Sequence, residues 1–517
     1  MGRFPISGLL GGIARAQGFR ARDRTAGNRE ASQFFLVALG ASIAAFSGLA
    51  AAAENTAKPA DPAALAAITP GLVWILPFAC ILLAIAIFPL MPRLSHWWEH
   101  NRNKLLVGLT LAAVTCLYYA LRGYGFAGSP PGVQAVAQAL RHAILLDYIP
   151  FIILLFSLYT ITGGIRLTGD VPAHPLTNCA FLLFGSVIAS FVGTTGASML
   201  LIRPLLQINS ERKNVKHTVI FFIFLVSNIG GALLPVGDPP LFLGYLRGVP
   251  FLWTLHLMPQ WALSVAILLG VYYVFDVIAY RHETKENIRW DETRRFALRL
   301  SGRRNFALLF GVVLAVGLLV PGNRFPGTNW VVPDLYLREL AQLILTGISW
   351  IWTPRRIHRE NYFNFTAIGE VASLFVGIFI AMQVPIEILK LKGDTLGITS
   401  PMQFFWATGL LSSFLDNAPT YVVFFELAGS LHHLGHVPVM DQLMTATGHI
   451  GMANLAAISC GAVFMGANTY IGNGPNFLVK SIAEGHGIKM PSFFGYMLYS
   501  GLILIPLFIV ISIVFFH

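Results

Sequence analysis

Long apolar segments separated by short polar loops run through most of the 517 residues. Segments of about 18 or more residues with almost no charge are typical of membrane-spanning helices. Two apolar segments, 176–207 and 401–428, have small or polar residues at their centres, so we expect helical hairpins that enter and leave on one side. The pattern predicts an all-α polytopic membrane protein with ten spanning segments: 71–92, 104–121, 144–165, 217–245, 254–280, 304–321, 334–352, 364–389, 448–480 and 493–516.

Two of the spanning segments carry helix breakers at bilayer depth. The stretch "GALLPVGDPPLFL" (231–243) aligns with "GANTYIGNGPNFL" (466–478), with six of thirteen positions identical. Prolines remove backbone donors, and glycines allow unusual backbone angles and close approach. A broken membrane helix persists only where its unpaired backbone groups face protein, water or substrate. The aligned breaks therefore predict the two halves of one ion or substrate site, lined by half-helix termini.

The breaks fall at equivalent places in two halves of the chain, 71–280 and 304–517. Each half is expected to hold three helices, a re-entrant hairpin, a broken helix and a last helix. Five crossings per half is an odd number, so the second half should be inverted relative to the first. The linker 281–303 carries seven Lys or Arg residues and is expected in the cytoplasm, where basic loops are retained.

The N-terminal residues 1–53 combine six arginines with an apolar stretch that ends in three alanines. This pattern is typical of a signal peptide with a long basic region, cleaved near Ala53, or of an uncleaved extra helix. Both alternatives place the linker 54–70 outside the cytoplasm. We expect a multi-pass protein of a bacterial inner membrane, surrounded by membrane lipid.

Composition excludes several classes of function. Only 11% of the residues are charged, against about 25% in soluble domains. The net charge of +11 comes from short basic loops, so no nucleic-acid partner is expected. The chain shows no Walker A sequence, no zinc motif and no catalytic cluster. We therefore expect transport driven by an ion gradient rather than an enzyme, with no cofactor and no structural metal.

Four carboxylates lie within or at the ends of apolar segments: Asp147, Asp238, Glu370 and Asp416. An intramembrane carboxylate is costly and suggests function, and a proton and Na+ can compete for it. We expect these four to couple proton and cation binding. Asp147 and Glu370 could instead be helix-start acids near the interface, and Asp238 could be the N-cap of a half-helix at 239–246.

Small oxygen-bearing residues and flexible glycines surround the predicted breaks and hairpin tips. Hard cations such as Na+ take oxygen ligands, including backbone carbonyls. The residues expected to bind the ion or substrate are Thr194, Thr195, Asn228, Gly231, Gly237, Ser413, Asn417, Thr420, Gly466, Asn468, Thr469, Asn473 and Asn476.

Three motifs resemble the ion-transporter superfamily: "SNIGGALLPVGDPP" (227–240), "EVASLFVGIFI" (370–380) and "SFLDNAPT" (413–420). That family includes NhaD-type sodium/proton antiporters, arsenite permeases, citrate transporters and dicarboxylate/sodium carriers. The resemblance implies alternating access, in which a transport domain moves against a scaffold, and a homodimer.

The resemblance leaves two functions open. Dicarboxylate carriers of the family have Ser-Asn-Thr at both hairpin tips, whereas this chain has Gly193-Thr194-Thr195 and Asp416-Asn417-Ala418. Asp416 would repel a free carboxylate unless a bound cation offset its charge. We therefore expect Na+ or Li+ exchange for H+, and the alternative is a citrate or other di- or tricarboxylate transporter coupled to Na+ or H+.

Overall fold

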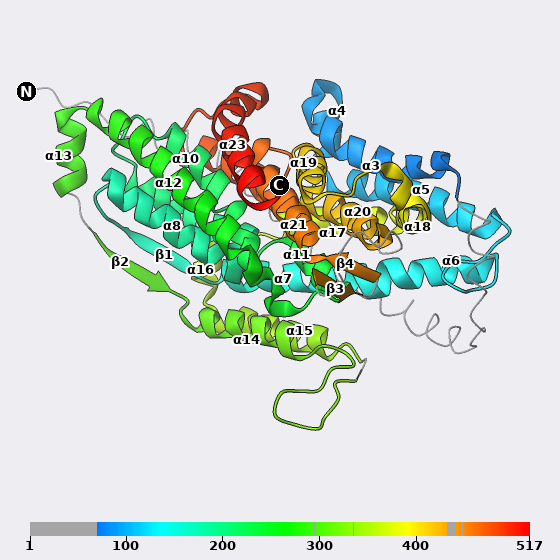
Figure 1. Ribbon diagram of the computed structural model, residues 1–517. Helices are drawn as coiled ribbons and strands as arrows, with labels where there is room; N and C mark the ends of the chain where they lie inside the picture. Colours follow the sequence, from blue (N-terminus) through cyan, green and yellow to red (C-terminus); the bar gives the residue numbers. More distant parts are fainter. Residues whose placement is uncertain (1–69, 294–295, 334, 432–440, 446–447) are drawn as a thin grey trace, which may run out of the picture.

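The computed structural model describes residues 70–517 except 294–295, 334, 432–440 and 446–447 (Figure 1). The expected signal peptide or extra helix, 1–53, lies outside the described residues, as does the linker that follows it up to residue 69. Nearly all regular structure in the described residues is helical, as the hydrophobic pattern predicts.

The first half runs from a short 3₁₀ turn to a long apolar helix. Its elements in chain order are η1 (Leu72–Ile75), α3 (Leu76–Ile87), η2 (Phe88–Leu90), α4 (Pro92–Trp98), α5 (Asn101–Leu121), α6 (Val133–Leu140), the π-helix η3 (Arg141–Tyr148), α7 (Ile149–Gly163), β1 (Arg166–Asp170), α8 (Pro175–Val192), α9 (Thr194–Ile208), α10 (Lys216–Leu225), η4 (Ile229–Leu233), α11 (Pro239–Leu246), η5 (Phe251–Leu257) and α12 (Met258–Arg281). The predicted hairpin at 176–207 is thus the pair α8–α9, and the predicted break in 217–245 separates α10 from α11.

The linker contributes α13 (Lys285–Thr293) and β2 (Phe296–Ser301). The second half then follows the same order of long helices, a hairpin, a broken helix and a last helix. Its elements are α14 (Arg304–Leu318), α15 (Leu337–Trp352), α16 (Arg355–Glu360), α17 (Thr366–Ala381), α18 (Gln383–Lys392), η6 (Gly393–Leu396), α19 (Pro401–Ser412), α20 (Asn417–Ser430), β3 (Gln442–Thr445), β4 (Gly448–Gly451), α21 (Met452–Met465), η9 (Gly466–Asn468), α22 (Gly474–Gly485) and α23 (Phe493–Phe515).

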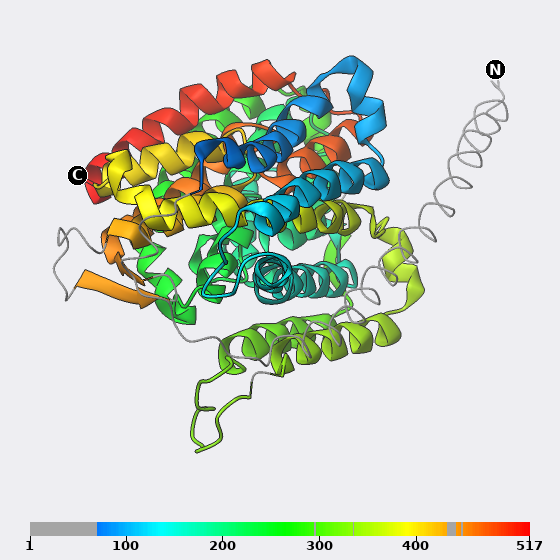
Figure 2. The ribbon, with the colours of Figure 1, turned by 90° about the vertical axis from the view of Figure 1, so that its right-hand side faces the viewer.

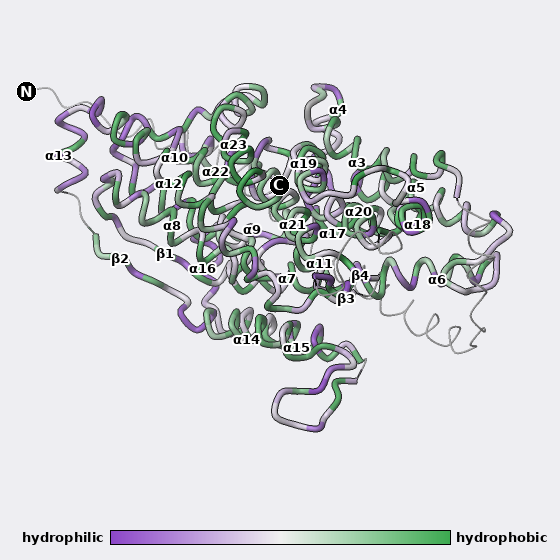
Figure 3. Tube along the Cα trace, viewed as in Figure 1, coloured by the Kyte–Doolittle hydropathy of each residue, from purple (hydrophilic) through white to green (hydrophobic). Residues whose placement is uncertain are grey.

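Six helices of the described residues are long and apolar enough to cross a membrane, and up to eight if each sharply bent pair forms one span. One bent pair is α3–α4, with an angle of 104°, and the other is α17–α18, with an angle of 40°. The predicted segment 71–92 is therefore shorter than expected, because prolines at 89 and 92 end α3 and turn the chain. Figure 3 shows hydrophobic residues along most of the long helices, whereas α13 is largely hydrophilic.

Close helix packing organises the bundle. Helix α5 packs along α17, and Gly108 and Gly377 let their backbones meet, since a Cβ on Gly377 would lie 2.5 Å from the Cα of Gly108. Small residues commonly allow such approach between membrane helices. Helices α14 and α15 lie side by side and pack on α7 at one edge of the molecule, as both ribbon views show (Figures 1 and 2).

Two short antiparallel sheets were not predicted. Strand β1 pairs with β2, with Arg166 opposite Ser301 and Leu167 opposite Leu300, so the basic linker is paired with the loop between α7 and α8. Strand β3 pairs with β4, just before α21. Both sheets lie in loops, where the sequence lacks the strict alternation by which a strand is recognised.

Candidate functional site

The two broken helices meet each other. Asn228 follows α10, and its Nδ2 donates to Oδ1 of Asn476 at 2.7 Å. Nδ2 of Asn473, at the start of α22, donates to Oδ1 of Asn228 at 3.1 Å and to the carbonyl of Ser227 at 3.1 Å. Residues 228 and 473 are far apart in the sequence, so the breaks form one buried polar centre, as the aligned motifs predict.

The Asp238 carboxylate lies at this centre and is 1% exposed. Oδ1 accepts a hydrogen bond from Oγ1 of Thr194 at 2.8 Å and a longer one from Nδ2 of Asn473 at 3.5 Å. Oδ2 accepts from Nδ2 of Asn417 at 3.2 Å. The three donors come from the first hairpin, the second hairpin and the second broken helix, and none of them is charged.

The alternative expectation, that Asp238 is the N-cap of the half-helix, is met only in part. Asp238 is the N-cap residue of α11, yet its side chain makes no capping hydrogen bond. The next two residues are Pro239 and Pro240, which have no N–H to donate. The carboxylate therefore points across to Thr194, Asn417 and Asn473 instead of back to its own helix.

Four helices begin at this centre: α9 at Thr194, α11 after Asp238, α20 at Asn417 and α22 after Asn473. A helix N-terminus behaves as about half a positive charge, so four of them supply roughly two. This field offsets part of the negative charge of two carboxylates, Asp238 and the nearby Asp416.

Glycines make the two breaks possible. A Cβ on Gly231 would lie 2.6 Å from Cγ2 of Thr194, and one on Gly466 would collide with the side chain of Asn417. A Cβ on Gly237 would collide with the carbonyl oxygen of Gly231, and its counterpart Gly472 approaches the carbonyl of Gly466 in the same way. The same close contacts thus recur in both halves, at positions separated by the offset of the sequence repeat.

Several predicted ligands of the second break hold its backbone together. Oγ1 of Thr469 donates to the carbonyl of Ser413 at 2.6 Å, and Nδ2 of Asn468 donates to Oγ of Ser413 at 2.8 Å. Nδ2 of Asn476 donates to the carbonyls of Gly466 and Thr469 at 2.8 and 2.9 Å. These bonds satisfy backbone groups that the break leaves free, which a membrane interior requires.

The second hairpin tip contains the remaining predicted residues. Asp416 is half-buried, caps α20 by accepting from the N–H of Ala418 at 3.0 Å, and lies within electrostatic range of Asp238. Oγ1 of Thr420 donates to the carbonyl of Asp416 at 3.0 Å. In the first hairpin, Thr195 is half-buried beside Thr194 in the first turn of α9. The tips therefore place Asp416 and Thr195 at the rim of the centre.

The other two predicted carboxylates lie elsewhere. Asp147 is 7% exposed and pairs through Oδ2 with Nη2 of Arg247 at 3.1 Å. Glu370 pairs with Nζ of Lys104 at 2.5 Å, and its side chain is 45% exposed. Neither carboxylate hydrogen-bonds to Asp238 or its donors, so the structure does not bring all four predicted acids together.

Sequence reasoning missed a buried charge cluster between the central helices and the surrounding ones. Arg247, at the end of α11, also contacts Glu426 of α20 at 3.2 Å, and Lys390 of α18 lies 3.7 Å from Glu426. Glu426 is 2% exposed. The sequence shows Arg247 near the end of an apolar segment, but it does not show that this arginine pairs with Asp147, which lies 100 residues earlier.

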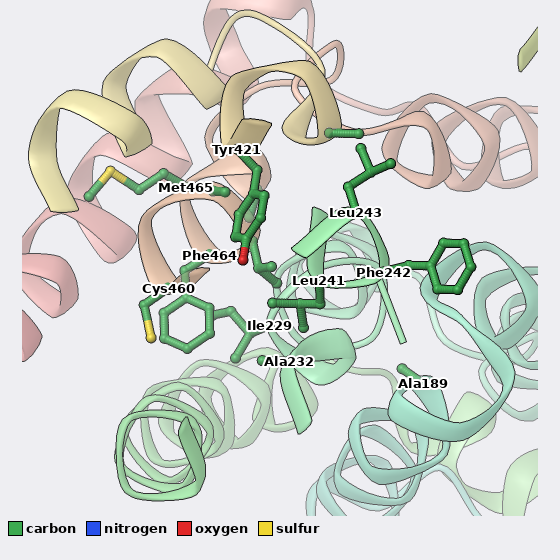
Figure 4. Packing of buried hydrophobic residues seen from close by; sticks show 14 of the residues in the cluster. Ala189, Ile229, Ala232, Leu241, Phe242, Leu243, Tyr421, Cys460, Phe464 and Met465 are labelled. Atoms are coloured by element: carbon green, nitrogen blue, oxygen red, sulfur yellow. The ribbon is translucent and has the colours of Figure 1, made fainter. Parts of the chain in front are cut away.

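Apolar side chains surround the polar centre. Figure 4 shows them packed beside the two breaks, from helices α8, α11, α20 and α21 and from η4. Those labelled are Ala189, Ile229, Ala232, Leu241, Phe242, Leu243, Tyr421, Cys460, Phe464 and Met465. Ring and aliphatic packing of this kind excludes water and strengthens electrostatic interactions at the centre. Among the described residues, no group of three or more His, Cys, Asp or Glu side chains is arranged to hold a metal ion.

Comparisons with known proteins identify the family to which the chain belongs. A family model described as "Putative citrate transport" matches residues 67–516. Comparison with the curated proteins gives no match. The match and the apolar helices together support a multi-pass membrane transporter. Because the match covers well over half of the chain, the protein belongs to this family.

Proposed function

We propose that the chain is a secondary transporter that exchanges Na+ or Li+ for H+ at Asp238. The observation that supports this proposal is a buried carboxylate whose three partners, Thr194, Asn417 and Asn473, are all neutral. A buried anion is stable only when it is paired or neutralised. In the described residues no basic side chain pairs with Asp238 and the helix N-termini offset its charge only in part, so a proton or a cation from solution would complete the neutralisation.

A single carboxylate of this kind is sufficient for exchange. When a proton occupies Asp238, the carboxyl group no longer attracts a metal cation, and when Na+ is bound the proton is displaced. Oxygen ligands for Na+ are available from Asp238, from Oγ1 of Thr194 and from carbonyls of the broken segments. Asp416 adds a second negative charge at the rim and would attract cations into the centre.

Alternating access would use the repeated arrangement of the two halves. We propose that the second half is inverted, so that each hairpin faces an opposite side of the membrane and the shared centre lies near the midplane. The hairpins and broken helices would then move together against α5, α7, α15 and α17. The matching glycine contacts of the two breaks support a common origin of the halves.

A second candidate function is cotransport of citrate or another di- or tricarboxylate with Na+ or H+. The four helix N-termini favour an anion, and the description of the family names citrate. In this case a bound cation would first neutralise Asp238 and Asp416. The carboxylate groups of the substrate would then accept hydrogen bonds from the hairpin tips.

One experiment separates the two functions. Purified protein is reconstituted into liposomes that contain a pH-sensitive dye, and Na+, Li+ or K+ is added outside. The exchange proposal expects alkalinisation of the vesicle interior that depends on Na+ or Li+ and occurs without citrate, because protons leave as the cation enters. Radiolabelled citrate uptake in the same vesicles, together with a pH signal unaffected by Na+, would instead establish the carboxylate function. Liposomes without protein give the background.

A further inference from the structure

A basic pocket lies far along the chain from the central site, where α4 meets α5. The pocket has a volume of about 560 Å³ and is lined by Arg93, His96, Trp97, His100, Arg102 and Asn103. None of these residues contacts Asp238 or the broken helices. Their role is therefore separate from the proposed exchange.

The pocket has a fixed shape because α4 is held against α3 and α5. The axis of α4 makes an angle of 104° with α3, so α4 runs across the direction of the spanning helix. Trp98 is 4% exposed and packs edge-on against Phe88, with ring centroids 5.1 Å apart. Nδ2 of Asn103 donates to the carbonyl of Trp97 at 2.6 Å, which ties the start of α5 to α4.

The pocket carries an unbalanced positive charge. Arg93 and Arg102 are exposed, and in the described part of the chain neither forms an ion pair with an acid. The acid nearest in sequence, Glu99, is 3.4 Å from Nδ1 of His96. Guanidinium groups bind phosphate through two parallel hydrogen bonds, so two unpaired arginines around one cavity suit a phosphate group.

Apolar side chains continue below the charged ones. Leu106 and Leu109 lie four and seven residues after Arg102, so the three share one face of α5, and both leucines are well exposed. Trp97 is 39% exposed at the pocket, and tryptophan is enriched at the membrane interface. A phosphate group bound to Arg93 and Arg102 would thus lie next to the exposed apolar strip of α5, which an acyl chain of the same lipid can cover.

We propose that this pocket binds the headgroup of an anionic phospholipid in the cytoplasmic leaflet. Its phosphate contacts Arg93 and Arg102, and one acyl chain lies along Leu106 and Leu109 of α5. The cytoplasmic side follows from the basic loops, and basic pockets beside spanning helices on that side are suited to anionic headgroups. The binding would fix the first spanning helices relative to the membrane surface.

The test measures which lipids the full-length protein retains. Protein in micelles that contain equal amounts of phosphatidylcholine and phosphatidylglycerol is examined by native mass spectrometry, and the ratio of the two bound lipids is determined. Wild type should prefer phosphatidylglycerol. The double variant Arg93→Gln/Arg102→Gln should reduce this preference about 25-fold, since each surface arginine contributes roughly fivefold.

Two further variants make the result specific. Arg93→Lys/Arg102→Lys keeps the charge and should retain most of the preference. Arg355→Gln/Arg359→Gln removes the same charge from exposed positions of another basic loop and should behave as wild type. If both double glutamine variants lose the preference for phosphatidylglycerol equally, the preference depends only on net charge, and the proposal is wrong.

The source of the phosphate is tested in the same samples. Inorganic phosphate is added, with sodium chloride at equal ionic strength as the comparison. Retention of phosphatidylglycerol in both conditions supports a lipid site. Selective displacement by inorganic phosphate would identify a site for a small anion and overturn the lipid proposal, as would a wild-type protein without lipid preference.

Discussion

Replacing Asp238 by asparagine removes the proposed coupling charge with little change in shape. The asparagine oxygen can keep the hydrogen bonds from Thr194 and Asn473, but its NH₂ group would face the NH₂ group of Asn417. One lost buried hydrogen bond costs about 1–3 kcal/mol. Removal of a buried charge that is only partly compensated offsets part of that cost, so we expect Asp238→Asn to fold and to reach the membrane.

The effect on cation binding should be much larger than the effect on stability. Two unit charges about 4 Å apart attract by about 4 kcal/mol at an effective dielectric constant near 20. Since each ~1.4 kcal/mol corresponds to a factor of ten, the variant should lose about a thousandfold in Na+ affinity. No proton can replace Na+ at an amide, so coupled exchange should be abolished even at saturating Na+.

The assay is Na+-dependent pH change in proteoliposomes, recorded as rate against Na+ concentration. Glu484→Gln, on the exposed face of α22, is a matched removal of one carboxylate and should behave as wild type. Size-exclusion chromatography of each variant establishes that the protein is folded. If Asp238→Asn exchanges at the wild-type rate with a half-saturating Na+ concentration within about tenfold of wild type, Asp238 is not the coupling group.

Three other substitutions test the remaining parts of the structure. Gly237→Ala forces a Cβ against a backbone carbonyl and should lower stability by about 1–3 kcal/mol, measured in a thermal-shift assay. Gly270→Ala, with open space around it, should not lower stability. Equal melting temperatures of the two variants would contradict the close approach at Gly237. Arg247→Gln leaves the buried Asp147 unpaired and Glu426 with only its 3.7 Å contact to Lys390, and it should cost about 3–5 kcal/mol. The exposed Arg356→Gln should leave the melting temperature unchanged. Glu370→Gln should retain Na+-dependent exchange, because the Glu370 carboxylate is partly exposed and shares no hydrogen bond with Asp238 or its donors. Loss of exchange in a folded variant would show that Glu370 takes part in coupling.

The parts of the fold that depend on local sequence could be predicted. Pro235 lies in the break between α10 and α11, and Pro239, Pro240 and Pro475 stand in the first turns of α11 and α22, where prolines are tolerated. The two breaks therefore follow from the sequence. The hairpins follow from small and polar residues at the centres of apolar segments. The aligned motifs further predicted that the two breaks meet, and the hydrogen bond between Asn228 and Asn476 agrees with that expectation.

The parts that depend on long-range pairing could not be predicted. Asp147 pairs with Arg247, whereas Glu370 pairs with Lys104. Those partners belong to different helices and have no equivalent spacing in the sequence. The strand pairing of β1 with β2 is similarly distant and lies in polar loops.

The origin of the three donors to Asp238 has a mechanical consequence. They are attached to three separate segments from both halves, while the carboxylate itself belongs to a fourth. If any one of these segments moved by a few ångströms, the buried Asp238 carboxylate would lose a hydrogen-bond donor that water could not replace. The proposed exchange would therefore proceed more easily if the four segments moved together, because separating them would leave the Asp238 carboxylate without its donors.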